Sequence, residues 1–170
     1  MTIAIHSANE KDLQTLYGIY DANGQSDDGY FEKCLELQEK GEREILIASL
    51  NDKPVGFCIL NWKPRYALYQ KLGIPEIQDL NVIPYARRQG VAKALIAYCE
   101  TRTCYQGQNV DQQLGVSVPL GPSFGAAQRL YWSQGYQPDG MGPTQDRQPV
   151  VEGQAYLLDQ DLCLMLVKAL

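Results

Sequence analysis

The fold of this chain is decided by the stretch Ile77-Gln-Asp-Leu-Asn-Val-Ile-Pro-Tyr-Ala-Arg-Arg-Gln-Gly-Val-Ala92. Apolar residues are frequent in its first part, which predicts a strand over Glu76–Val82 that ends just before a proline. After a basic turn that contains a glycine, apolar residues recur at three- and four-residue spacing, which predicts an amphipathic helix over 88–102. A turn of this kind places several backbone N–H groups at a helix N-terminus, where a pyrophosphate can bind.

The side chains of this turn also favour a phosphate ligand. Gly90 has no Cβ, so the backbone there can approach a ligand closely. Arg87, Arg88 and Lys93 add positive charge where phosphate groups would lie. The same residues would also fit an ordinary strand–loop–helix unit whose arginines are merely solvated. The turn is therefore interpreted either as a phosphate site or as a structural connection.

The composition is typical of one globular domain. The chain has 170 residues, of which 45% are hydrophobic and 21% are charged, and this length predicts a single domain over 1–170. Its net charge of −5 argues against non-specific binding to DNA or RNA, which needs a basic face. The same acidic balance is compatible with a cationic, amine-bearing substrate.

Targeting signals and metal motifs are not found. No basic leader precedes an apolar stretch, and the longest strongly apolar run, 162–167, is too short to cross a bilayer. These features predict a cytoplasmic protein without a membrane partner. The five cysteines include no Cys-x-x-Cys pair and His6 is the single histidine, so no metal site is predicted. Apolar surroundings predict buried free thiols at Cys58, Cys99 and Cys163.

The remaining elements predict an α/β fold. The turn-rich tetrapeptide 51–54 suits a hairpin between two strands, 44–50 and 55–62. Segment 63–73 is interpreted as a loop or short helix, and the tract 137–150, rich in Pro, Gly, Gln and Asp, as a long connection. Because hairpin-linked strands are mixed with crossover helices, we expect a mixed, twisted sheet. Further strands are expected at 2–6, 114–118 and 161–168, and further helices at 9–22, 30–40 and 122–134.

The pattern Leu80-x-Val82-x-Pro84-x-x-Arg87-x-x-Gly90-x-Ala92 resembles the acetyl-CoA signature of the GNAT N-acetyltransferase superfamily. The order of the predicted elements is also the order for which that superfamily is known, so the resemblance covers nearly the whole chain. It implies an acyl-CoA N-acyltransferase fold, in which about four helices flank a central twisted mixed sheet of six to seven strands.

The resemblance also implies a site for acetyl-CoA that is built largely from backbone groups. The backbone N–H of Val82 matches the donor that meets the oxyanion of the tetrahedral intermediate, and the pantetheine arm would pair with the strand around it. The pyrophosphate would lie on the turn and the start of the helix. The residues assigned to acetyl-CoA are Leu80, Asn81, Val82, Arg87, Arg88, Gln89, Gly90, Val91, Ala92 and Lys93.

A general base is expected near the acceptor, because amide formation needs a neutral amine and alkyl amines are mostly protonated near neutral pH. Glu76 resembles the catalytic glutamate of the histone acetyltransferase branch, since it precedes Arg87 by the same offset. Alternation along the strand puts Glu76 on the face of Leu80 and Val82 and puts Asp79, the rival base, on the opposite face. Two alternatives stay open: relayed waters with no single base, and a purely structural Glu76.

A general acid is implied by the segment Leu130-Tyr131-x-x-x-Gly135-Tyr136, which resembles Leu-Tyr-x-x-x-Gly-Phe of the superfamily. The tyrosine hydroxyl of that segment lies near the sulfur of CoA, which makes Tyr131 the acid or a thiol ligand. The alternative is that Tyr131 packs in the core beside Ala127. Phe124 stands where the superfamily usually has an asparagine, so one polar contact to the pantetheine arm is not expected.

The acceptor side allows several interpretations. In the superfamily the acceptor pocket is usually lined by the segments that match 25–30 and 63–69 here. Acidic residues there could attract an ammonium group and nearby aromatic residues could pack against it, or both could be ordinary surface. The tract 137–150 could close over the site as a lid or be a passive insertion. The residues concerned are Asp27, Asp28, Trp62, Tyr66 and Tyr69.

These features predict an N-acetyltransferase that transfers the acetyl group of acetyl-CoA to a primary amine by direct attack in a ternary complex, without a metal. The acceptor is a small-molecule or peptide amine, and the alternative of a homodimer stays open. Two other functions are weighed. One is a non-catalytic acyl-CoA-binding regulatory module, and the other is a toxin-type acetyltransferase acting on aminoacyl-tRNA, against which the net charge of −5 argues.

Overall fold

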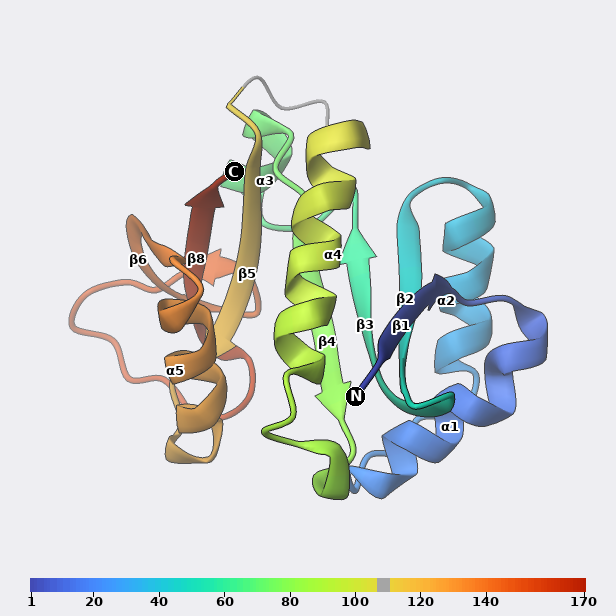
Figure 1. Cartoon of the computed structure of the whole chain (residues 1–170). Coiled ribbons are helices and arrows are strands. Elements are labelled where there is room, and N and C mark those ends of the chain that lie inside the picture. Colours follow the sequence, from blue (N-terminus) through green and yellow to red (C-terminus); the bar gives the residue numbers. More distant parts are fainter. Residues whose placement is uncertain (107–110) are drawn as a thin grey trace. The chain divides into compact units, whose positions relative to one another are not determined.

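Figure 1 shows the chain as a computed structural model, which describes residues 1–106 and 111–170. These residues form two compact units, each built from two stretches of sequence. Unit 1 comprises residues 1–63 and 77–102, and unit 2 comprises residues 64–76 and 103–170. The single domain predicted over 1–170 stays a prediction. Residues 107–110 lie outside the described residues.

Unit 1 contains four strands in the order β1-β2-β3-β4, and β2 is antiparallel to both of its neighbours. The sequence predicts all of its elements, and β4 has the predicted bounds. The first residue of β4 and the end of α4 belong to unit 2. The elements are β1 (Ile3–Ser7), α1 (Leu13–Ala22), α2 (Tyr30–Glu39), β2 (Arg43–Leu50), β3 (Lys53–Asn61), β4 (Glu76–Val82) and α4 (Val91–Gln106).

Local sequence explains two of the boundaries in unit 1. Asn9 forms a capping box with Asp12 ahead of α1, since its side chain accepts from a backbone N–H and its own N–H donates to the Asp12 carboxylate at 3.0 Å. Asn51 and Asp52 both have left-handed backbone conformations, with φ of 49° and 64°. Two such residues make the tight turn that matches the twist of a hairpin, which confirms the predicted β2–β3 connection.

The core of unit 1 is partly aromatic. The Phe31 ring of α2 makes edge-to-face contacts with Tyr17, Tyr20 and Phe57, with ring centroids 5.0–5.3 Å apart. On β3, a Cβ added to Gly56 would lie 2.8 Å from the Asn81 carbonyl oxygen of β4. A glycine is therefore needed where these two strands approach each other.

Unit 2 contains four strands in the order β5-β8-β6-β7, and β8 is antiparallel to both β5 and β6. The short β7 pairs with the end of β6. The elements of this unit are α3 (Ala67–Leu72), β5 (Gln113–Pro119), α5 (Gly125–Ser133), β6 (Gln137–Gln145), β7 (Gln148–Pro149) and β8 (Leu162–Ala169).

The prediction of a long connection over 137–150 is wrong, because this tract forms β6 and β7. Its alternation is broken by an irregularity between Pro138 and Pro143, where the pairing with β8 shifts register. Gly140 and Gly142 have φ of 86° and 78°, so the strand leaves the ladder and returns to it. The prolines and glycines that suggest a loop from sequence are therefore the residues of a bulged strand.

The core of unit 2 contains two tyrosines for which the sequence leaves open a contact with the acceptor amine or an ordinary surface position. Tyr66 and Tyr69 are buried in a cluster with Ile74 and Met165, and the Tyr69 hydroxyl donates to the Leu166 carbonyl oxygen at 2.6 Å. Both side chains are therefore packing residues of the core, and the interpretation of Tyr69 as an acceptor contact is wrong.

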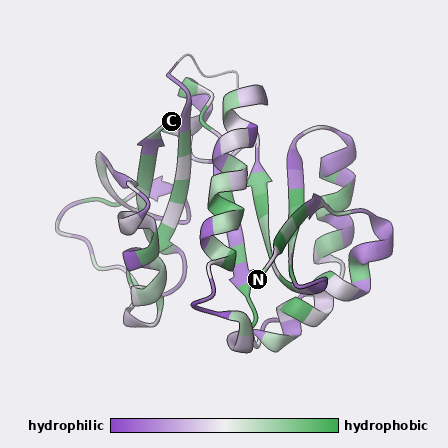
Figure 2. Cartoon of the chain, in the orientation of Figure 1, coloured by the Kyte–Doolittle hydropathy of each residue, from purple (hydrophilic) through white to green (hydrophobic). Residues whose placement is uncertain are grey.

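The described residues contain eight strands and five α-helices, compared with the predicted six to seven strands and about four helices. The two additional strands are β6 and β7, and the additional helix is α3, which the sequence leaves open as a loop or short helix. Figure 2 shows that hydrophobic residues are concentrated on strands such as β3 and β8. Within the described residues no helix has both the length and the apolar character needed to cross a membrane.

Candidate functional site

The connection between β4 and α4 contains most of the residues that the sequence assigns to acetyl-CoA. A short 3-10 turn, Pro84–Ala86, follows the strand, and the helix begins at Val91. Arg88 and Gly90 have φ of 63° and 87°, so the chain turns sharply before the helix. The first turn of a helix has N–H groups without intrahelical partners, and these are the groups that bind anions.

The three predicted cations of this connection differ in what they contact. The Arg87 guanidinium donates to the Val82 carbonyl oxygen at 3.0 Å and to the Asn23 side chain at 2.7 Å. It therefore links the turn to the end of β4 and to the end of α1. Arg87, Arg88 and Lys93 are all exposed. Their charges lie at the surface, where a phosphate could reach them.

The backbone of β4 is irregular at Asp79. This residue has a φ of 49°, and the Asn81 side chain donates to its carbonyl oxygen at 3.1 Å. A left-handed residue interrupts the two-residue alternation of a strand. The argument that alternation puts Glu76 on the face of Leu80 and Val82 therefore does not hold across Asp79.

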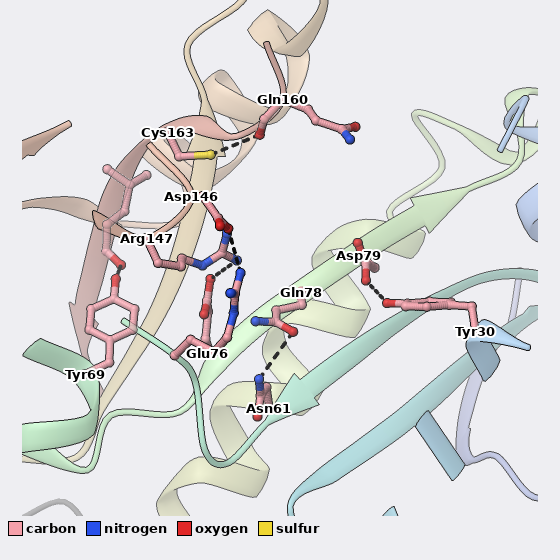
Figure 3. Close-up of polar contacts among 12 residues, drawn as sticks. Tyr30, Asn61, Tyr69, Glu76, Gln78, Asp79, Asp146, Arg147, Gln160 and Cys163 are labelled. Carbon is pink, nitrogen blue, oxygen red and sulfur yellow. Dashed lines mark hydrogen bonds and ion pairs between the residues drawn. The ribbon is translucent and has the colours of Figure 1, made fainter. Parts of the chain in front are cut away.

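Asp79 pairs with a tyrosine of α2. The Tyr30 hydroxyl donates to the Asp79 carboxylate, as Figure 3 shows, and the Tyr30 ring stacks on Tyr20 with centroids 5.7 Å apart. Burial, followed by the Asp79 charge, raises the pKa of Tyr30 far above the usual value. The hydroxyl therefore stays protonated as a donor, while the Asp79 residue itself is exposed.

Glu76, the predicted base, is buried and lies against an arginine. Its Oε1 is 2.9 Å from Nη2 of Arg147, which is in the turn between β6 and β7 (Figure 3). Burial lowers the pKa of Arg147, but the Glu76 charge opposes this and the net pKa is raised. The guanidinium is therefore a permanent positive charge beside this carboxylate.

Tyr131, the predicted acid, lies on α5 in unit 2. The residue is buried, and its ring packs edge-to-face on Tyr136 with centroids 5.6 Å apart and planes at 76°. Phe124 precedes α5 at its N-terminal boundary. The core packing that the sequence offers as an alternative is present, and the catalytic assignments of Tyr131 and Glu76 stay predictions.

The loop between α1 and α2 has an acidic hollow of about 360 Å³ in unit 1. The Tyr17 hydroxyl donates to the Glu32 carboxylate at 2.5 Å on its wall. This hollow contains both acidic residues that the sequence assigns to the acceptor. The lining residues are Tyr17, Asp21, Ser26, Asp27, Asp28, Gly29 and Glu32.

Tyr30 and Arg147 are the residues that sequence reasoning misses. Tyr30 lies 49 positions from its partner Asp79, and Arg147 lies 71 positions from Glu76. No local pattern indicates either pairing, because both are created by the tertiary fold. Among the described residues, no group of three or more His, Cys, Asp and Glu side chains is arranged to hold a metal ion.

A family model described as the acetyltransferase (GNAT) domain matches residues 41–138 of the chain. This segment includes β4, its turn and the whole of α5. Among curated proteins, no sequence matches the chain.

Solved structures with similar folds extend over nearly the whole chain. A ribosomal-protein-alanine N-acetyltransferase from Brucella melitensis has a TM-score of 0.70 at 20% identity, covering 98% of this chain and 99% of its own. PaiA N-acetyltransferase from Thermoplasma acidophilum, in complex with coenzyme A, has a TM-score of 0.65 at 15% identity and full coverage of both chains. YncA from Salmonella typhimurium, with its cofactor acetyl-CoA, has a TM-score of 0.66 at 15% identity, covering 99% and 94%.

Proposed function

The chain belongs to the GNAT acetyltransferase family, and from this membership we propose that it transfers the acetyl group of acetyl-CoA to a primary amine. The observation that carries the proposal is the β4–α4 connection. It combines a left-handed Gly90 with the N-terminus of a long helix and two exposed cations, Arg88 and Lys93. Backbone N–H groups and flexible cations together are suited to a pyrophosphate.

The cofactor residues take different roles in this proposal. Arg88, Lys93 and the N–H groups from Gln89 to Ala92 hold the phosphates, whereas Arg87 holds the turn in shape through its bonds to Val82 and Asn23. The pantetheine arm pairs with the backbone of Leu80, Asn81 and Val82. Two of the neighbouring folds were solved with coenzyme A or acetyl-CoA, which supports this choice of ligand.

The reaction needs a base, an oxyanion donor and an acid. Glu76 accepts a proton from the ammonium group, and the neutral amine attacks the thioester carbonyl carbon. The Val82 N–H stabilises the oxyanion of the tetrahedral intermediate. As this intermediate collapses, the C–S bond breaks and Tyr131 donates its proton to the departing thiolate. The attacking nitrogen loses its second proton to water and Tyr131 regains a proton from water, which gives the neutral amide and CoA.

The acceptor is a cation at neutral pH, and the acidic hollow in unit 1 supports such a ligand. Asp21, Asp27, Asp28 and Glu32 contribute four carboxylates to its wall, and opposite charge attracts an ammonium group over several ångströms. The Brucella melitensis protein of similar fold is named for acetylating a ribosomal-protein alanine. An N-terminal peptide amine and a small polyamine-like molecule are therefore the two acceptors to compare.

The test measures the release of CoA thiol from acetyl-CoA with a panel of amines: an alanine-initiated peptide, spermidine and an aminoglycoside. We expect one of them to raise the rate above hydrolysis. Glu76→Gln and Tyr131→Phe should each lower turnover roughly 100-fold while acetyl-CoA still binds, since each removes one proton transfer.

Two exposed residues supply matched controls, Glu39→Gln and Tyr105→Phe, which should leave turnover unchanged. Wild-type rates in both Glu76→Gln and Tyr131→Phe would refute the catalytic roles. Binding of acetyl-CoA without turnover of any amine would favour the non-catalytic module.

A further inference from the structure

The turn between β6 and β7 brings two charged side chains onto residues 64–76. Asp146 and Arg147 form this turn with φ of 46° and 67°, between the paired residues Gln145 and Gln148. The Asp146 carboxylate lies 2.6 Å from the Arg65 guanidinium, and Arg147 lies 2.9 Å from Glu76. A hairpin of this type points its two turn residues away from the ladder, which explains why both reach other segments.

The two ion pairs differ in burial. The side chains of Arg65 and Asp146 are 71% and 60% exposed, whereas those of Arg147 and Glu76 are 17% and 0% exposed. An exposed pair contributes little to stability, because water and salt screen it. Breaking a buried ion pair by removing one partner is costly, so the contact between Arg147 and Glu76 matters more than the exposed pair.

Other groups in unit 2 lie within reach of this charge pair. The Glu76 charge contributes to the raised pKa of Tyr69, after burial, and burial raises the pKa of Cys163 to about 11 while the Arg147 charge opposes that rise. Tyr69 already donates to a backbone carbonyl and Cys163 donates to the Gln160 carbonyl oxygen at 3.2 Å. Both groups thus have backbone partners of their own, and Arg147 is the cation that lies against the Glu76 carboxylate, 2.9 Å away.

We propose that Arg147 is a positioning residue of the acetyl transfer, and that the β6–β7 hairpin places its side chain against Glu76. The inference rests on the proposed function. Arg147 fixes the direction of the buried Glu76 carboxylate through the 2.9 Å contact between Nη2 and Oε1. When Glu76 accepts the proton of the ammonium group, Arg147 keeps its own proton and stays hydrogen-bonded to the neutral acid.

The hairpin itself is held in place, as this role requires. The Asp146 backbone N–H donates to the Asp161 carbonyl oxygen at 3.0 Å, and Thr144 and Gln145 are in register with Pro149 and Gln148. These contacts fix the turn from two sides, independently of the Arg147 side chain. In this proposal the tract 137–150 supports the carboxylate of the base, instead of closing over the site as a lid or being a passive insertion.

The experiment is a double-mutant cycle on turnover, measured as CoA release with the best amine of the panel. If no amine raises the rate above that of acetyl-CoA hydrolysis, the hydrolysis rate is measured instead. The variants are Arg147→Gln, Glu76→Gln and both together. We expect Arg147→Gln to lower kcat by roughly 10- to 100-fold with KM for acetyl-CoA within about twofold, because it misplaces the reacting group without touching the cofactor. In the Glu76→Gln background the same change should have no further effect on kcat.

Two further variants separate positioning from folding. Arg147→Lys keeps the charge and should recover part of the lost kcat. Asp146→Asn breaks the exposed pair of the same turn and should leave kcat unchanged. Melting temperatures are measured for every variant, and Arg147→Gln should be rescued in stability by Glu76→Gln, since the pair is then neutral.

Equal loss of kcat from Arg147→Gln in both backgrounds would show a purely structural hairpin and would overturn the inference. An unchanged kcat in Arg147→Gln would do the same. A wild-type chain that neither binds acetyl-CoA nor releases CoA would instead refute the proposed function, and with it this role of Arg147. The two failures are therefore distinguishable by the binding measurement on the wild type.

Discussion

At the scale of single residues, the same side-chain type serves different purposes within one turn. Arg87, Arg88 and Lys93 are all exposed, but Arg87 is also hydrogen-bonded to Val82 and Asn23 and stabilises the connection. From sequence alone the three cations are equivalent, because their spacing says nothing about which carbonyl or amide will lie nearby. The sequence predicts that this turn is basic, and the structure shows that Arg87 is hydrogen-bonded to Val82 and Asn23.

The cysteines give a prediction at this scale. Cys104 is exposed, while the predicted buried thiols Cys58, Cys99 and Cys163 are confirmed as buried. Burial raises the pKa of Cys163 to about 11, so at pH 8 it stays a thiol, and only the thiolate reacts with alkylating agents. We expect iodoacetamide at pH 8 to modify Cys104 first, as measured by mass spectrometry of peptides. Fast labelling of Cys163 in folded Cys104→Ser protein would contradict this expectation.

At the scale of elements, prediction from sequence succeeds where the pattern is regular. The frequent apolar residues of β4 and the spacing of apolar residues in α4 correctly locate both, although the helix begins at Val91 because Arg88 and Gly90 are left-handed. The tract 137–150 is missed for the opposite reason. Two left-handed glycines and a register shift remove the two-residue period by which a strand is identified.

A stability prediction belongs to the same scale. Gly56→Ala adds a Cβ 2.8 Å from the backbone oxygen of Asn81, so β3 and β4 have to move apart. We expect a loss of about 1–3 kcal/mol in the free energy of unfolding, measured in urea. The control is Gly18→Ala in α1, where nothing lies within 4 Å of the new Cβ. This change should be neutral or stabilise by roughly 0.5–1 kcal/mol. An equal response of the two variants would show that the β3–β4 contact is not tight.

At the scale of the whole molecule, the element order and the basic turn predict the fold and the family, and both are confirmed. The catalytic side chains are less predictable. Glu76 and Tyr131 come from a resemblance. The partner of Glu76 is Arg147, which lies 71 positions away and which no local pattern indicates, whereas Tyr136, which packs on Tyr131, belongs to the same sequence motif. The proposed cofactor site consists largely of backbone groups, which a sequence motif can indicate, whereas the proposed acceptor site consists of side chains on loops.

The central claim is that the β4–α4 connection binds acetyl-CoA. The most direct measurement is a thermal-shift titration of the wild type with acetyl-CoA, CoA and NAD, repeated for Gly90→Glu and for Gly153→Glu. Both glycines are left-handed, with φ of 87° and 85°, so the two variants carry similar backbone strain and the same added charge.

We expect acetyl-CoA and CoA, but not NAD, to stabilise the wild type and Gly153→Glu, by about 2.7 kcal/mol when the ligand is at 100 times its Kd. Gly90→Glu should fold and lose this stabilisation, because a carboxylate then occupies the phosphate position. An undiminished shift in Gly90→Glu, or no shift with acetyl-CoA in the wild type, would contradict the account.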